Sequence, residues 1–243
     1  MKPPVFCTAG ESDALHHARN QLLQWGYEVS FAASHQTTHL LLPVPSFDAP
    51  GVIKGNRLIS DVLTNLPENA TIFGGNLPPL PRPCVDFLKD EFYLGENAAI
   101  TAHCALKIIQ QHTGDLTGAK VLVIGWGRIG KRLVSLLHGQ GALVCVAVRK
   151  SSDMQALQEL GYTALIPTQW NPIQYNIIIN TAPALLMHEA DAHPSALLLD
   201  LASTRGIEGN RVIWARGLPN RDAPDASGLL MAKTALRYAL GKE

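Results

Sequence analysis

Apolar runs and amphipathic stretches alternate along the first part of the chain. Short apolar runs at 5–7, 39–45 and 70–73, and an alternating run at 27–31, predict strands. Ser12 and Asp13 are typical helix caps, and apolar positions from Leu15 to Trp25 follow them at helical spacing until Gly26. A second helix is predicted at 58–66. Residues 1–92 are therefore expected to form a small, flavodoxin-like α/β domain.

The second part repeats the alternation with longer elements. After the proline-rich segment 76–83, a helix is predicted at 97–112 between the two domains. Strands are predicted at 121–124, 143–148, 163–166, 177–180, 196–201 and 211–214, and helices at 128–139, 152–160 and 227–240. This order predicts an α/β fold. We expect a Rossmann-type doubly wound parallel sheet in 93–243, a smaller N-terminal α/β domain, and a cleft between them.

Composition narrows the class of protein. Hydrophobic residues make up 47% of the 243 residues, and 20 basic residues balance 20 acidic ones, which favours an enzyme and gives no reason to expect nucleic acid as a partner. No apolar run reaches the roughly 20 residues that cross a bilayer. Neither the four scattered cysteines nor the histidines have metal-ligand spacing. No signal peptide is recognised, so we expect a cytoplasmic protein with reduced thiols and no bound metal.

A glycine loop carries the clearest chemical signal. It reads Gly125-Trp126-Gly127-Arg128-Ile129-Gly130, between a predicted strand and a predicted helix. In a dinucleotide site the first glycine permits a tight turn, the second lets the backbone approach the pyrophosphate, and the third lets helix and strand pack closely. The free amides of the helix start then bind phosphate. We interpret all six residues as cofactor-binding; the alternative is a glycine-rich turn without a ligand.

The end of the second strand bears on the choice of cofactor. NAD sites place an acidic residue there to bind the ribose hydroxyl. This chain has Arg149, Lys150 and Ser151, followed by Ser152, which suit the 2′-phosphate of NADP. We therefore predict NADP, with NAD possible; the alternative is a solvated basic strand end.

Two later strand ends carry polar loops. One loop is Asn180-Thr181-Ala182-Pro183 and the other, Asp200 to Arg205, contains Ala202 and Ser203. Ligands in such sheets bind outside the carboxyl ends of the strands, so both loops are candidates for the nicotinamide half of the cofactor. The alternative is ordinary turn chemistry.

These motifs resemble the NADP-dependent subunit of dipicolinate synthase, a family related in fold to 2-hydroxyacid dehydrogenases. The resemblance is strongest over 95–235, and it is carried by the segments 95–102, 125–130, 149–152, 179–183, 199–203, 217–219 and 223–224. It implies oxidation of a dihydrodipicolinate-type ring to dipicolinate, with hydride passing to NADP. It also implies a second, flavoprotein-like subunit. We further expect a homo-oligomer.

The chain departs from the family in three places. Its N-terminal domain is short, 204–209 replaces a Pro-Gly-Gly turn, and Asp225 stands where the family tends to have lysine. An anion in place of a cation matters near a dicarboxylate site. Two other functions therefore stay open: a dehydrogenase for another small carboxylate, and a non-catalytic NADP(H)-binding or partner-regulated protein.

Candidate catalytic residues follow from the reaction. A dicarboxylate needs cations, and Arg205 is preferred over Arg216 and Arg221. Loss of a ring proton needs a base, for which Glu96 and His103 are candidates. The alternatives are a helix cap at Glu96 and Asn97, and a partly buried structural histidine. The expected substrate-binding residues, several of them implied by the resemblance, are Pro43, Val44, Asn97, Thr101, Leu218 and Pro219; residues 44–46 could instead form a simple turn.

Overall fold

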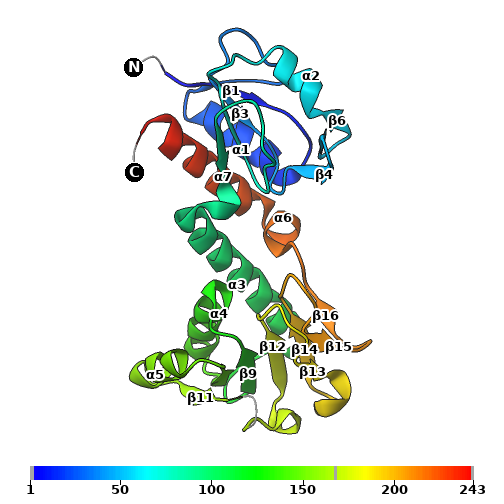
Figure 1. The fold of residues 1–243 in the computed structure, drawn as a ribbon. Coiled ribbons are helices and arrows are strands. Elements are labelled where there is room, and N and C mark those ends of the chain that lie inside the picture. Colours follow the sequence, from blue (N-terminus) through cyan, green and yellow to red (C-terminus); the bar gives the residue numbers. More distant parts are fainter. Residues whose placement is uncertain (1–2, 167–168, 242–243) are drawn as a thin grey trace. The chain divides into compact units, whose positions relative to one another are not determined.

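The computed structural model describes residues 3–166 and 169–241 (Figure 1). The chain divides into two compact units. The first unit comprises residues 1–97 with 219–243, and the second comprises 98–218. This division differs from the expected one, because the C-terminal segment belongs to the N-terminal unit and not to the Rossmann unit.

The first unit contains a five-stranded parallel sheet. Its strands are β1 (Val5–Thr8), β2 (Glu28–Ser30), β3 (His39–Leu41), β7 (Thr71–Gly74) and β8 (Cys84–Asp86), in the order β2-β1-β3-β7-β8. Counted within this sheet, the order is 2-1-3-4-5, that of a flavodoxin-like doubly wound fold. A three-stranded antiparallel sheet, β4 (Phe47–Ala49), β5 (Val52–Ile53) and β6 (Arg57–Leu58), was not predicted; α2 (Ile59–Thr64) follows it.

Packing of two helices explains why the C-terminal segment joins this unit. Helix α1 (Asp13–Gln24), capped by the Ser12 hydroxyl as predicted, packs along α7 (Pro224–Ala239). A side chain at Gly228 would collide with the backbone of α1 at the Ala14 carbonyl, 2.5 Å away. The glycine therefore lets the two helices approach closely, and their small apolar faces bury each other.

The far end of α7 is tied to the start of α3 (Glu91–Thr113) through Asp90. This carboxylate accepts hydrogen bonds from the Tyr238 hydroxyl at 2.7 Å and the Tyr93 amide at 2.7 Å, and it forms an ion pair with Arg237. Burial acts to raise the pKa of Asp90, but these hydrogen bonds outweigh it and hold that pKa below its usual range.

The second unit contains a six-stranded parallel sheet. Its strands are β9 (Lys120–Ile124), β10 (Leu143–Ala147), β11 (Thr163–Leu165), β12 (Ile177–Asn180), β14 (Leu197–Asp200) and β16 (Ile213–Trp214). They lie in the order β11-β10-β9-β12-β14-β16, which is 3-2-1-4-5-6 within the unit. This is the Rossmann order, so the predicted fold class is confirmed. Helices α4 (Arg128–Gly139) and α5 (Ser151–Glu159) connect the first three strands (Figure 1).

Short elements complete the chain. A two-stranded parallel sheet pairs β13 (Met187–His188) with β15 (Ile207–Glu208), and α6 (Leu218–Asp222) precedes α7. The long helix α3 begins six residues earlier than predicted, and Gly95 lies inside it. Within 3–166 and 169–241, no helix combines the length and apolar character of a membrane span.

Candidate nucleotide-binding site

A cavity of about 390 Å³ lies at the carboxyl ends of β9, β10 and β12. The order of the sheet reverses between β9 and β12, and Rossmann folds bind dinucleotides at this switch point. Eight of the residues predicted to bind the cofactor line this cavity: Gly125, Trp126, Gly127, Arg149, Lys150, Thr181, Ala182 and Pro183. The structure thus brings together three segments that are well separated along the chain.

The three glycines of the loop differ in what surrounds them. Gly125 has φ +102°, and a side chain there would lie 2.7 Å from the Thr181 hydroxyl. A side chain at Gly130 would collide with the Gly125 carbonyl oxygen. By contrast, no atom lies within 4 Å of the position that a Cβ would take at Gly127. Two glycines therefore permit close packing, and the third leaves open space.

This open space suits a pyrophosphate. Helix α4 begins directly after Gly127, and no side chain caps it. First-turn amides of a helix have no intrahelical acceptor, and the helix dipole adds partial positive charge. The chain therefore offers phosphate-binding donors with room in front of them, as a dinucleotide requires.

Thr181 holds the glycine loop in place. Its backbone amide and its hydroxyl both donate to the Ile124 carbonyl oxygen, each at 2.9 Å. The same hydroxyl lies against the positions of Gly125 and Gly130. Thr181 lines the cavity, but its hydroxyl already has an acceptor, so its clearest role is to fix the loop against β12.

Asn180 also serves the protein itself. Its side chain is fully buried, donates to the Ala182 carbonyl and to Asp200, and accepts from the Ala182 amide. Asp200, equally buried, accepts from the amides of Ala202 at 3.0 Å, Gly206 at 2.6 Å and Ile207 at 3.0 Å. This pair fixes the loops after β12 and β14, and the role of Asp200 was not predicted from the sequence.

Several predicted cofactor residues do not line the cavity. They are Arg128, Ile129, Gly130, Ser151, Asn180, Ala202 and Ser203. Gly130 and Asn180 shape the cavity from behind, through the contacts described above. Ala202 is buried, and its carbonyl accepts from the Trp214 indole at 3.1 Å.

The basic strand end is accompanied by an acid that was not predicted. Asp153, in the first turn of α5, lines the cavity together with Arg149 and Lys150. It lies three residues after Lys150, and the first turn of the helix brings it back toward the strand end. Trp170 and Leu186 also line the cavity. A carboxylate therefore lines the cavity beside the two cations.

Two of the candidate arginines share one aromatic ring. The guanidinium carbons of Arg205 and Arg216 each lie 5.1 Å from the centroid of the Trp214 ring. Both arginines are exposed. Arg221 instead forms an ion pair with Asp222 at 2.7 Å, which lowers the pKa of Asp222. Arg205 and Arg216 therefore both pack against Trp214, at the end of β16.

The candidates on α3 are placed differently from one another. Glu96 is exposed and Asn97 half-buried, and both lie in the second turn of α3, so neither caps the helix. His103 is exposed and is hydrogen-bonded through Nδ1 to the Ala99 carbonyl oxygen at 2.9 Å; it is not the partly buried histidine of the alternative interpretation. Thr101 is buried.

The predicted substrate-side loop bonds to its own unit. The Pro43 carbonyl accepts from the Ser46 hydroxyl at 2.7 Å, and the Val44 carbonyl accepts from the Asn220 amide nitrogen at 2.6 Å. Leu218 is fully buried and Pro219 is buried. Both carbonyls therefore have partners within the protein. All four cysteines are free, and no cluster of three potential metal ligands occurs in the part of the chain that the structure describes.

The sheet order, the glycine loop and the cavity together define a Rossmann-type nucleotide fold joined to a flavodoxin-like α/β unit. This fold is also that of one of the subunits of dipicolinate synthase. The structure of that subunit from Bacillus subtilis matches with a TM-score of 0.80 at 21% identity, covering 100% of this chain and 99% of that one. The structure from Bacillus halodurans matches with a TM-score of 0.79 at 20% identity, covering 98% and 97%.

Another solved structure shares the fold more distantly. A transhydrogenase from Sinorhizobium meliloti has a TM-score of 0.71 at 15% identity, with 97% of this chain and 94% of that one covered. No protein-family model and no curated protein sequence matches the chain. The predicted resemblance to the dipicolinate synthase subunit is thus confirmed in the fold.

Proposed function

We propose that this chain is an oxidoreductase that binds NADP(H) in the cavity between β9 and β12. The observation that carries the proposal is the cavity itself, which combines open space at Gly127, an uncapped helix start and two cations at the next strand end. These are the groups that a dinucleotide phosphate ester requires. A nicotinamide cofactor, when bound, supplies the acceptor for a hydride.

The choice of NADP depends on the polar groups at the end of β10. Arg149 and Lys150 suit a 2′-phosphate, whereas Asp153 suits the free ribose hydroxyls of NAD. Two cations against one carboxylate favour NADP. NAD is the alternative cofactor, and Asp153 is the observation in its favour.

For the reaction, we propose oxidation of a dihydrodipicolinate-type ring to dipicolinate. Support comes from the likeness to two dipicolinate synthase structures over 98% and 100% of this chain, and from the motifs that the sequence shares with that family. The oxidation removes one hydride and one proton from the ring and forms a C=C bond. Hydride goes to the cofactor, and the proton goes to a base.

Residues of this chain supply binding and proton transfer. Arg205 and Arg216, which both pack against Trp214, each carry a guanidinium group that suits a carboxylate. Glu96 and His103 remain the candidates for the base. Asp225 lies in the first turn of α7, where an acid is favoured by the helix dipole, so it has a structural reason to be present.

Self-association and a second subunit belong to the same proposal. The expected partner is a flavoprotein-like subunit, and we also propose a homo-oligomer. Light scattering on the purified protein, by itself and with the candidate partner, tests both. A monomer that forms no complex would contradict this part and leave the cofactor assignment intact.

The experiment that tests the function measures product and binding in the same preparation. Freshly generated 4-hydroxy-tetrahydrodipicolinate, which forms the dihydro ring by losing water, and NADP are supplied with the candidate second subunit, and dipicolinate is followed by its absorbance. NADPH and NADH are titrated calorimetrically. We expect dipicolinate together with NADPH; binding of neither cofactor would refute the proposed function.

A non-catalytic role is the second candidate, and the departure at 204–209 favours it. Gly206 lies so close to Asn180 that a side chain there would collide with the Asn180 amide. This turn therefore packs tightly against β12 and is not a loose insertion. NADPH binding without turnover, with the second subunit present, would support this role. Turnover of another 2-hydroxy or imino acid would instead identify a different carboxylate as substrate.

A further inference from the structure

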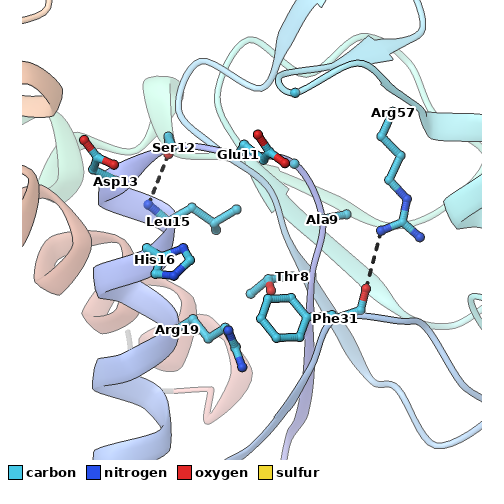
Figure 2. Close-up of a pocket in the computed structure, with 12 residues that line it drawn as sticks. Thr8, Ala9, Glu11, Ser12, Asp13, Leu15, His16, Arg19, Phe31 and Arg57 are labelled. Carbon is cyan, nitrogen blue, oxygen red and sulfur yellow. Dashed lines mark hydrogen bonds between the residues drawn. The ribbon is translucent and has the colours of Figure 1, made fainter.

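A second cavity, of about 520 Å³, lies entirely within the first unit (Figure 2). It is lined by the end of β1, the start and one face of α1, and the residues Phe31 and Arg57. Parallel doubly wound sheets bind ligands at the carboxyl ends of their strands, next to the point where the strand order reverses. In this sheet the order reverses beside β1. The function proposed above makes no use of this cavity.

Arg19 brings a guanidinium group with unused donors to this cavity. It lies four and seven residues from Leu15 and Ser12, on the same face of α1. Its guanidinium carbon lies 3.4 Å from the centroid of the Phe31 ring, and its Nε is buried without a hydrogen-bond partner. A buried donor without an acceptor is costly. Because protein atoms cover this nitrogen, a ligand would be bound by the terminal nitrogens of the guanidinium group.

Two more donors line the same cavity. Arg57 makes one long hydrogen bond, from Nη1 to the Phe31 carbonyl at 3.4 Å, which leaves most of its five donors available. Thr8 is only 4% exposed, yet its hydroxyl makes no hydrogen bond to the residues that the structure describes. Three side chains from β1, α1 and β6 thus present unused hydrogen-bond capacity to one space.

Two acidic residues also line the cavity. Figure 2 shows the carboxylates of Glu11 and Asp13 at the start of α1, whereas Arg19 lies beside the Phe31 ring. Asp13 precedes Arg19 by six residues, which is about 9 Å along the helix axis. His16 lies between them. Asp13 is therefore separated from Arg19 along α1, whereas the Glu11 side chain lies against Gly55, two residues before Arg57.

We propose that this cavity binds the oxyanion of a small organic molecule, a phosphate or a carboxylate, through Arg19, Arg57 and Thr8. Guanidinium groups bind both oxyanions with forked hydrogen bonds. Phe31 is 60% exposed, which is unusual for an aromatic residue, and its ring would lie against the organic part of the ligand. A volume of about 520 Å³ accommodates a molecule well beyond an inorganic anion.

The test uses the full chain carrying Arg149→Ala and Lys150→Ala, so that the nucleotide cavity contributes little to phosphate binding. Inorganic phosphate and benzoate are titrated separately by calorimetry at constant ionic strength. Saturable binding of phosphate identifies a phosphate ligand, and saturable binding of benzoate identifies a carboxylate ligand. If neither phosphate nor benzoate binds saturably, the proposal is overturned. This result does not depend on whether NADP(H) binds.

Variants connect the binding to this cavity. Arg57→Ala is expected to weaken the bound probe about fivefold or more, and Thr8→Val about threefold, because each removes a donor with little change in packing. Lys233→Ala, an exposed cation on α7 of the same unit, is the matched control and should leave binding unchanged. Equal weakening by Lys233→Ala, or no weakening by Arg57→Ala and Thr8→Val, would overturn the proposal. Circular dichroism establishes that each variant is folded.

Discussion

Replacing Arg149 and Lys150 by alanine tests the nucleotide cavity most directly. Both side chains line the cavity at the end of β10, and both are exposed. A charge-assisted hydrogen bond to phosphate contributes at most about 1.5–3 kcal/mol, and solvent screening reduces this to about 1 kcal/mol for an exposed cation. The two changes together should therefore weaken NADPH by about 2 kcal/mol, or about 30-fold in Kd.

The comparison with NADH makes the measurement specific. NADH has no 2′-phosphate, so the double variant should bind it with nearly unchanged affinity. Calorimetric titration of both cofactors into wild type and variant measures this directly. Lys107→Ala, which removes an exposed cation of α3 outside the cavity, is the matched control and should change neither affinity.

Asp153 provides the opposite test. If it binds the ribose hydroxyls, Asp153→Asn weakens NADH more than NADPH, and the cofactor is NAD. Under our proposal, Asp153→Asn instead leaves NADPH binding equal or slightly tighter, because it removes a negative charge near the 2′-phosphate.

For the double variant Arg149→Ala with Lys150→Ala, equal weakening of NADPH and NADH would refute the role assigned to Arg149 and Lys150.

Three further predictions concern the glycine loop and the scaffold. Gly127→Ala should leave the thermal midpoint unchanged but weaken NADPH binding in calorimetry, since only open space surrounds that position. Gly130→Ala should lower the free energy of unfolding by about 1–3 kcal/mol, because the new side chain collides with the loop; Gly139→Ala, which meets no atom, is its control. Asp200→Ala should lower the free energy of unfolding, measured in urea, by at least about 3 kcal/mol, because several buried donors lose their acceptor. A loss below about 1 kcal/mol would contradict this account. Asp90→Asn should lower the free energy of unfolding at neutral pH. The difference in this free energy from wild type should shrink as pH falls below about 4, because stability from a lowered carboxyl pKa is lost on protonation. A difference that does not change with pH would contradict the stated cause.

Local patterns were sufficient to predict much of the fold. The helix capped by Ser12, the strand–glycine loop–helix at 121–139 and the strands of the Rossmann sheet all appear where expected. Each depends on residues close together in the sequence, such as a cap, an apolar period or a glycine needed by a tight turn. Element boundaries were predicted less accurately: α3 begins six residues earlier than predicted, where the Asp90 carboxylate accepts from the Tyr93 amide and caps the helix.

Roles that depend on partners distant in sequence could not be predicted. Thr181 was expected to contact the cofactor, and it lines the cavity; its hydrogen bond to Ile124, 57 residues earlier, could not be predicted. Asp200 was named only as part of a polar loop, although it joins two loops through the buried Asn180. A polar residue after a strand looks the same in the sequence whether it faces a ligand or a neighbouring loop, and only sheet order and register decide between them.

The sequence by itself determined that a glycine loop with the dinucleotide-binding pattern follows the first strand of a parallel α/β sheet, because glycine spacing and apolar periodicity are local properties of the chain. Only the tertiary structure decided which neighbours complete each site. It packed α7 onto α1 because Gly228 allows close contact, and it brought Asp153 to the same cavity as Arg149. It also gathered Thr8 and Arg57, far apart in sequence, around one space. Such convergence arises from how strands are ordered and helices packed, which no single segment encodes.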